Sequence, residues 1–152
     1  MVHRSNSVRQ TEAVAAALAA TLAGGECVAL YGDLGAGKTQ FVRGLVRGLG
    51  GDPRSVSSPT FVLLNVYDTG RLTVYHLDAY RVGGPDDFEA IGFAELLEEG
   101  GVVVVEWASR VADLLPVTGR IDVSIRATGS SARTVVVRRP GDVPPTPGST
   151  SG

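Results

Sequence analysis

The spacing of apolar residues changes several times along the chain, and each change predicts a different element. The alanine-rich stretch 11–22 has apolar residues at every fourth position, which is typical of an amphipathic helix. Residues 7–10 precede it with the spacing of a capping box. Residues 26–31 then predict a short buried strand, and the apolar residues of 41–49 repeat with the period of a second helix.

Strand-like patterns dominate the middle and the end of the chain. Stretches 61–67 and 72–77 are separated by a short polar turn and predict a β-hairpin. Residues 102–105 are four consecutive valines, the pattern of a strand that is buried on both faces. The remaining expected elements are a short helix that opens at Pro85, another that ends near Leu115, and late strands at 120–127 and 133–138.

These elements predict an α/β fold in three layers, a P-loop NTPase-like mixed sheet flanked by helices. The length of 152 residues indicates about one domain. We expect this domain to span residues 1–139, followed by a disordered tail at 140–152, which is rich in Pro, Gly, Ser and Thr. Hydrophobic residues make up 43% and charged residues 20% of the chain, which excludes a largely disordered chain, a coiled coil and a collagen-like rod.

Charge and cysteine content narrow the class of protein further. The net charge of -2 creates no strong field that would attract nucleic acid or an anionic membrane. Cys27 is the only cysteine, which excludes an intramolecular disulfide and a cysteine metal cluster. No apolar run approaches the roughly 20 residues that span a bilayer, and residues 1–6 lack the apolar core of a secretory signal. We therefore expect a cytoplasmic protein with no membrane contact.

The strongest chemical signal is a phosphate-binding loop. Residues 32–39 read Gly-Asp-Leu-Gly-Ala-Gly-Lys-Thr and match G-x-x-x-x-G-K-[ST] at every defined position. Glycines let backbone N–H groups surround phosphate oxygens, and the following helix adds its positive N-terminal end. Lys38, the only lysine of the chain, is expected to bridge the β- and γ-phosphates, and the Thr39 hydroxyl to bind Mg²⁺. The expected phosphate-binding residues are Asp33, Leu34, Gly35, Ala36, Gly37, Lys38 and Thr39.

Two acidic residues stand where apolar strands end. Asp78 follows the stretch 72–77 and Glu106 follows the four valines. Ligands of open parallel sheets lie beyond the carboxyl ends of the strands, so parallel strands would bring both acids to the edge that holds Thr39. Asp78 then fits the Walker-B role on Mg²⁺, and Glu106 either binds Mg²⁺ or activates the attacking water. The competing interpretation is that each acid only caps the next helix.

Other candidates carry weaker signals. Thr60 lies in a Ser-Pro-Thr segment where nucleotide hydrolases often have a mobile γ-phosphate sensor, although its composition alone favours a plain turn. His76 is expected to be a packed, hydrogen-bonded side chain rather than a catalytic base. Trp107 either shields the site from water or belongs to the core. Arg81 either contacts phosphate or forms a surface ion pair.

Four blocks in order carry a resemblance to a known family. They are YGDLGAGKT at 31–39, SPTF at 58–61, HLDAYR at 76–81 and VEW at 105–107. With these blocks the chain resembles, over residues 11–138, the bacterial TsaE (YjeE) family, the ATPases of tRNA threonylcarbamoyladenosine biosynthesis.

The resemblance implies an ATPase that works with two partner proteins, TsaB and TsaD, in placing threonylcarbamoyl on an adenosine of tRNA. TsaD would carry out the transfer, and the ATPase would support turnover of the complex. Because the net charge is -2 and the sequence has no basic stripe, we expect the partners to bind tRNA and this chain to meet it only indirectly. ATP and Mg²⁺ would be its ligands. By position, the resemblance implies that Lys38 binds phosphate and that Thr39 and Glu106 bind Mg²⁺. It also gives Asp78 the Walker-B role and places Thr60 in the switch-like segment.

Some expectations stay open at the level of sequence. Thr11 and the turn at Gly129 are candidates for adenine contacts by family position. Two other functions remain as alternatives: a small nucleotide or metabolite kinase, and a binding module in which hydrolysis is incidental. A kinase usually needs an arginine-rich lid, and no arginine cluster of the sequence resembles one. The site also shows no arginine finger of its own, so we expect slow hydrolysis that partners accelerate.

Overall fold

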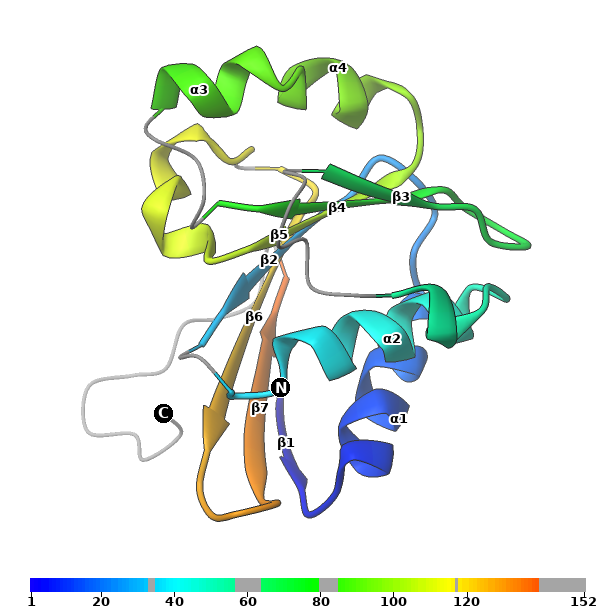
Figure 1. Ribbon diagram of the computed structural model, residues 1–152, viewed down its shortest axis with the longest axis vertical. Coiled ribbons are helices and arrows are strands. Elements are labelled where there is room, and N and C mark those ends of the chain that lie inside the picture. The colour runs from blue at the N-terminus through cyan, green and yellow to red at the C-terminus, as the bar shows by residue number, and fades with distance from the viewer. Residues whose placement is uncertain (33–34, 57–63, 80–84, 117, 140–152) are drawn as a thin grey trace.

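The computed structural model describes residues 1–32, 35–56, 64–79, 85–116 and 118–139 (Figure 1). Asp33, Leu34, Thr60, Arg81 and the expected tail 140–152 lie outside the described residues. The strands are β1 (Val2–Ser5), β2 (Cys27–Tyr31), β3 (Leu64–Tyr67), β4 (Val74–Asp78), β5 (Val102–Glu106), β6 (Arg120–Ala127) and β7 (Arg133–Arg138). The α-helices are α1 (Val8–Ala19), α2 (Lys38–Gly48), α3 (Pro85–Ala90) and α4 (Phe93–Glu98), with 3₁₀ turns η1 (Pro53–Ser55), η2 (Ala108–Arg110) and η3 (Ala112–Leu114).

All seven described strands form one mixed sheet in the order β1-β7-β6-β2-β5-β4-β3. The four central strands β6, β2, β5 and β4 run parallel to one another. The outer strands β7, β1 and β3 pair antiparallel with their neighbours. The carboxyl ends of β2, β4 and β5 therefore lie at the same edge of the sheet, and the predicted mixed α/β fold is confirmed.

Two apolar clusters cover the two faces of the sheet and make the fold three-layered. Val28 and Leu30 of β2 pack with α1 and α2, whereas Cys27 and Ala29 of the same strand pack with α4, η2 and η3. Figure 1 shows α1 and α2 together on one side of the sheet and α3 and α4 at the top of the view. The four valines of β5 alternate between both clusters and are fully buried, as their pattern predicted.

Small residues let α2 lie very close to α1. A Cβ atom added at Gly44 would lie 2.3 Å from the carbonyl oxygen of Glu12, and one added at Gly48 would lie 2.7 Å from the Cβ of Ala19. Any larger side chain at either glycine would push the helices apart. Because the motif residues Lys38 and Thr39 belong to the first turn of α2, this contact also holds the helix that carries them.

The first helix starts where its capping signal predicts. Ser7 is the N-cap of α1, and its side chain accepts a hydrogen bond from the backbone N–H of Gln10. The helix covers Val8–Ala19 rather than 11–22, because the cap sets the start. The two glycines at 24 and 25 have positive φ angles of 110° and 89° and separate the helix from β2.

One prediction about local structure is wrong, and one strand was not predicted. The helix expected to end near Leu115 is instead the two 3₁₀ turns η2 and η3, because Val111 between them has φ -132° and ψ 22° and is buried at 4% exposure. The N-terminal residues form β1, which pairs with β7 and was not predicted. A four-residue edge strand with three polar side chains carries little pattern of its own.

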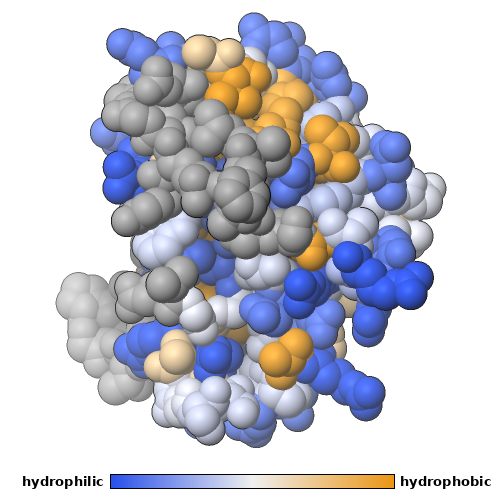
Figure 2. All heavy atoms as spheres, viewed as in Figure 1, coloured by the Kyte–Doolittle hydropathy of each residue, from blue (hydrophilic) through white to orange (hydrophobic). Residues whose placement is uncertain are grey.

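The surface in Figure 2 is mostly polar, with apolar side chains gathered in the region of α3 and α4. This part of the molecule contributes the partly buried side chains of Ile91, Leu96 and Leu97 to the second cluster. Within the described residues, no helix has the length and apolar character needed to cross a membrane.

Candidate functional site

The two predicted acids lie next to each other at the carboxyl edge of the sheet. Glu106 is the register partner of Leu30 in β2 and of Asp78 in β4. Both carboxylates are nearly buried, with 8% exposure for Asp78 and 4% for Glu106. The prediction that these strands run parallel to the strand feeding the loop, and end beside it, is confirmed.

The described ends of the loop are Gly32, directly after β2, and Gly37, directly before α2. Gly32 has φ +155°, and a Cβ added there would lie 2.6 Å from the carbonyl oxygen of Ile125 in β6, so only glycine fits. Gly37 is the N-cap of α2 with φ 109° and has no side chain to cap the first N–H groups. The first N–H groups and the positive dipole end of α2 therefore face the loop region. Thr39 lies in the same first turn of the helix.

Lys38 stands at the centre of this arrangement and is buried to 6% exposure. Its ammonium Nζ donates a hydrogen bond to the Gly32 carbonyl oxygen at 2.5 Å. The same atom lies 3.8 Å from the centre of the Trp107 ring, which is within the range of a cation–π interaction. The backbone and the aromatic ring thus hold the ammonium beside the loop.

Trp107 follows Glu106 directly and has an unusual backbone conformation. Its φ of 58° is the only positive φ of a non-glycine residue in the described part of the chain. A bulky side chain in the left-handed region costs about 1–2 kcal/mol and usually persists only where its surroundings require it. This conformation aims the indole at Lys38 while the ring also packs against the second apolar cluster. Both roles left open for Trp107 thus fit its position.

Glu106 is held by a buried histidine. The Glu106 Oε2 atom lies 2.5 Å from Nε2 of His76, and Nδ1 of the same ring lies 3.0 Å from the Tyr67 hydroxyl. His76 has no exposed surface. The prediction that His76 is a packed, hydrogen-bonded side chain is confirmed, whereas its connection to Glu106 and Tyr67 was not predicted.

Arg133 contacts the loop from β7, a contact that the sequence did not predict. Its Nε donates to the Ala36 carbonyl oxygen at 2.8 Å, and its Nη2 donates to that of Gly35 at 3.3 Å. Nη1 donates to the Gly129 and Ala132 carbonyl oxygens in the β6–β7 turn. A loop that turns its N–H groups toward an anion must direct its carbonyl groups elsewhere. Arg133 supplies donors to two of these carbonyls.

One candidate for adenine contact is not placed to make it. Thr11 is 2% exposed, and its hydroxyl is 2.8 Å from that of Ser5, a bond that joins α1 to β1. The turn at Gly129 does lie beside the loop, through Arg133. Arg133 itself has no local sequence signal, because it reads as an ordinary residue of a β-strand until the strands are paired.

The residues at the edge fit a magnesium ion that nucleotide phosphates help to bind. Mg²⁺ prefers oxygen ligands and is usually held by one or two carboxylates together with phosphates and water. Asp78 and Glu106 supply two adjacent carboxylates in a nearly buried position, and Thr39 supplies a hydroxyl in the first turn of α2. Among the described residues there is no group of three or more His, Cys, Asp and Glu that could hold a metal by itself.

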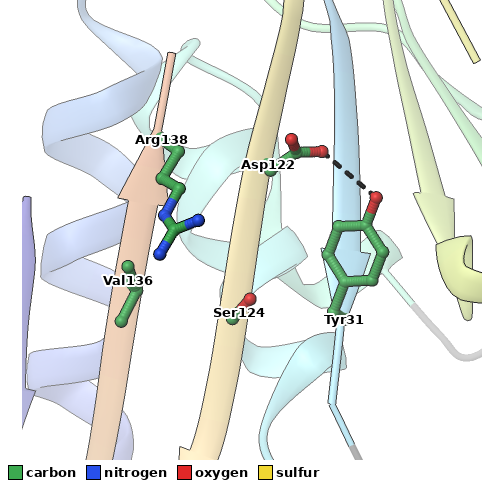
Figure 3. A pocket seen from close by; sticks show the side chains of 5 residues that line it. All are labelled: Tyr31, Asp122, Ser124, Val136 and Arg138. Carbon is green, nitrogen blue, oxygen red and sulfur yellow. Dashed lines mark hydrogen bonds between the residues drawn. The ribbon is translucent and has the colours of Figure 1, made fainter. Parts of the chain in front are cut away.

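A pocket of about 330 Å³ lies elsewhere, on the sheet face opposite to α2 (Figure 3). Its lining residues come from β2, β6 and β7 and are Tyr31, Asp122, Ser124, Val136 and Arg138. The Tyr31 hydroxyl donates to Asp122 at 3.2 Å. Partial burial and the nearby Asp122 carboxylate raise the pKa of Tyr31 to about 12. None of the residues predicted for the nucleotide site lines this pocket.

Comparisons with known proteins show the family to which the chain belongs. Residues 5–135 match the family model of TsaE, described as threonylcarbamoyl adenosine biosynthesis protein TsaE. The chain belongs to the TsaE family. The matched range includes the loop, both acids, His76 and Arg133. The family, which the sequence blocks suggested, is therefore confirmed.

Individual relatives extend along most of the chain. The tRNA threonylcarbamoyladenosine biosynthesis protein TsaE of Treponema pallidum is 42% identical over 133 residues, which cover 88% of this chain and 96% of the relative. The Bacillus subtilis protein of the same name is 39% identical over 132 residues, covering 87% and 81%. The crystal structure of Bacillus subtilis YdiB superposes with a TM-score of 0.73 and 32% identity, covering 93% of this chain and 86% of that one.

Proposed function

We propose that this TsaE-family protein binds and hydrolyses Mg-ATP at the carboxyl edge of the sheet, and that hydrolysis supports threonylcarbamoyladenosine modification of tRNA together with TsaB and TsaD. One observation carries the proposal: the ends of three parallel strands bring a lysine, the start of a helix and two buried acids to one place. The family membership gives the process in which the reaction takes part.

The loop and α2 bind the triphosphate in this proposal. The first N–H groups of α2 and the helix dipole favour negative charge at Gly37. The Lys38 ammonium donates a hydrogen bond to the Gly32 carbonyl oxygen. In the proposed complex it would also bind the β- and γ-phosphates. Trp107 limits the positions of that ammonium and covers it from water.

Asp78 and Glu106 then complete the hydrolytic site. A magnesium ion bound with ATP would neutralise charge that develops on the phosphate oxygens. Thr39 and the two carboxylates are the residues that would hold it. Hydrolysis forms a bond from a water oxygen to the γ-phosphorus and breaks the bond from that phosphorus to the β–γ bridging oxygen, giving ADP and phosphate. Glu106 either holds the metal or takes the proton of this water.

The partners follow from the family and from the charge of the chain. Curated relatives are named for tRNA threonylcarbamoyladenosine biosynthesis. A chain with a net charge of -2 has little overall attraction for phosphate backbones. TsaB and TsaD would therefore bind the tRNA, and this protein would act on their complex through ATP.

An ATPase assay with and without the TsaB–TsaD complex tests the proposal. We expect slow release of phosphate by the protein alone and faster release with the complex, and Lys38→Ala should lose both. A fast enzyme that is indifferent to TsaB–TsaD would contradict the proposed role. Parallel reactions with nucleoside monophosphates test the kinase alternative, because rapid formation of diphosphates would identify a phosphotransferase instead.

A further inference from the structure

Three neighbouring strands each contribute one member of a buried hydrogen-bonded row. Tyr67 comes from β3, His76 from β4 and Glu106 from β5. The two hydrogen bonds measure 3.0 Å from Tyr67 to His76 and 2.5 Å from His76 to Glu106. The Tyr67 residue is 6% exposed and the imidazole is fully buried, so water cannot easily replace either bond.

The donors and acceptors of this row fit one arrangement of protons in the neutral ring. A carboxylate only accepts hydrogen bonds, so Nε2 of His76 must carry a proton in order to bond to Glu106. In the neutral imidazole Nδ1 is then an acceptor, and the Tyr67 hydroxyl donates to it. Tyr67 thus favours the tautomer that lets His76 donate to the carboxylate.

We propose that His76 is a positioning residue for Glu106, and that Tyr67 supports it by fixing the tautomer. The imidazole holds Oε2 of the carboxylate, which removes rotation of the side chain at the edge of the sheet. The second carboxylate oxygen then keeps a constant direction relative to Asp78, the register partner of Glu106. The catalytic consequence rests on the proposed function, because it requires that Glu106 act on magnesium or water.

The position of the row distinguishes it from ordinary core packing. His76 belongs to the face of β4 that packs toward α2, as Val74 two residues earlier does. Apolar residues fill the neighbouring positions of β5 on this face, and burying polar groups there costs free energy unless every group is paired. The row ends at one of the two acids of the candidate site. Partners behind a metal-binding group typically change affinity or activity by about 10- to 100-fold when removed.

Enzyme assays of two substitutions at His76 test the positioning role. His76→Leu removes the donor, whereas His76→Gln keeps an N–H₂ group that can reach Glu106. We expect His76→Leu to lower kcat about tenfold or more and to raise the Mg²⁺ concentration for half-maximal activity. ATP affinity without Mg²⁺ should remain within about twofold, and His76→Gln should recover part of the loss. His3→Gln in β1 is the matched control and should behave as the parent.

Nuclear magnetic resonance of the imidazole gives a readout that does not depend on catalysis. The chain has two histidines, so the His3→Gln variant assigns the ring signals of His76. We expect ¹⁵N shifts that place the proton on Nε2, and a weakened preference in Tyr67→Phe, which removes one hydroxyl. Tyr67→Phe also provides the kinetic test if His76→Leu fails to fold, with a smaller loss of kcat of about two- to fivefold.

The outcomes separate this inference from the proposed function. If the parent releases no phosphate from ATP under any condition, the proposed ATPase is wrong, whereas the ring shifts still decide whether His76 holds Glu106. If the parent is active and His76→Leu equals it in kcat and Mg²⁺ dependence, the positioning role is wrong and the ATPase stands. An imidazole without a proton on Nε2 would also overturn the role.

Discussion

Two regions of the sheet differ in how deeply their charged residues are buried. One is the carboxyl edge of β2, β4 and β5. The other is the face of β6 and β7 that lies opposite to α2 and lines the pocket, here called the open face. At the edge, Lys38, Asp78 and Glu106 are each at most 8% exposed. On the open face, Arg138 is exposed, and Asp122 forms an ion pair of 3.2 Å with Arg120 in which both side chains are about 30% exposed. The two regions belong to one sheet, and β2 takes part in both.

This difference in burial supports the proposed nucleotide site at the edge. Charges removed from water are costly, and they persist where a ligand or a precise partner compensates them. Partly exposed pairs such as Arg120–Asp122 contribute at most about 1 kcal/mol and tolerate change. Substitutions at the edge should therefore change nucleotide affinity or the rate of hydrolysis, and matched substitutions on the open face should change neither.

The largest effect is expected for Lys38→Ala. Removing the ammonium beside the loop should weaken ATP and ADP binding about 100-fold, which corresponds to about 2.7 kcal/mol. Isothermal titration calorimetry measures this directly. Arg138→Ala removes a cation from the open face and should bind both nucleotides as the parent does. Equal affinity of parent and Lys38→Ala would refute the phosphate-loop assignment.

Glu106→Ala should separate hydrolysis from binding. The carboxylate lies at the site but belongs to β5 rather than to the loop, so we expect turnover to fall about 10²-fold or more. ATP affinity should change only severalfold. Steady-state phosphate release and calorimetry measure the two quantities, and Asp122→Ala is the matched loss of an acid on the open face. Turnover equal to that of the parent would remove Glu106 from the mechanism.

Arg133 and Arg138 sharpen the comparison because both belong to β7. Arg133→Ala deletes the donors to the Gly35 and Ala36 carbonyl groups, and each lost hydrogen bond is worth about 0.5–1.5 kcal/mol. The loop should then lose its fixed shape, and ADP affinity should fall about three- to tenfold. Arg138→Ala should retain the parent affinity. If both variants bind ADP equally well, Arg133 does not organise the loop.

The site was predictable from sequence as far as it depends on strand ends. The rule for carboxyl ends placed Asp78 and Glu106 at the edge where β2 ends, and the parallel pairing of their strands agrees with it. The contacts of Arg133, and of His76 with Tyr67, join residues on different strands. They depend on strand register and pairing, which no local pattern specifies.

The fold shows the same division. Buried strands with continuous valines and the capped α1 were predictable because their signals are local. The strand β1 forms only because β7 offers it an edge. The turns after Trp107 are 3₁₀ because Val111 packs in the second apolar cluster with a backbone conformation that is not helical. In both cases tertiary packing decides the structure against a weak local preference.

The smallest effect is expected at Tyr31, where β2 meets the open face. Burial and the Asp122 carboxylate raise the pKa of this hydroxyl from 10 to about 12. Protonated tyrosine is thus favoured in the folded state, and this stabilisation is present below pH 10 and is lost as the pH rises toward 12. Tyr31→Phe cannot ionise, so its stability should fall less than that of the parent between pH 9 and pH 11. Urea unfolding at the two pH values measures the change. An identical decrease in parent and variant would show that Asp122 and the pocket do not hold the Tyr31 proton. The Tyr31–Asp122 hydrogen bond would then add little to stability, and the open face would tolerate substitution even there.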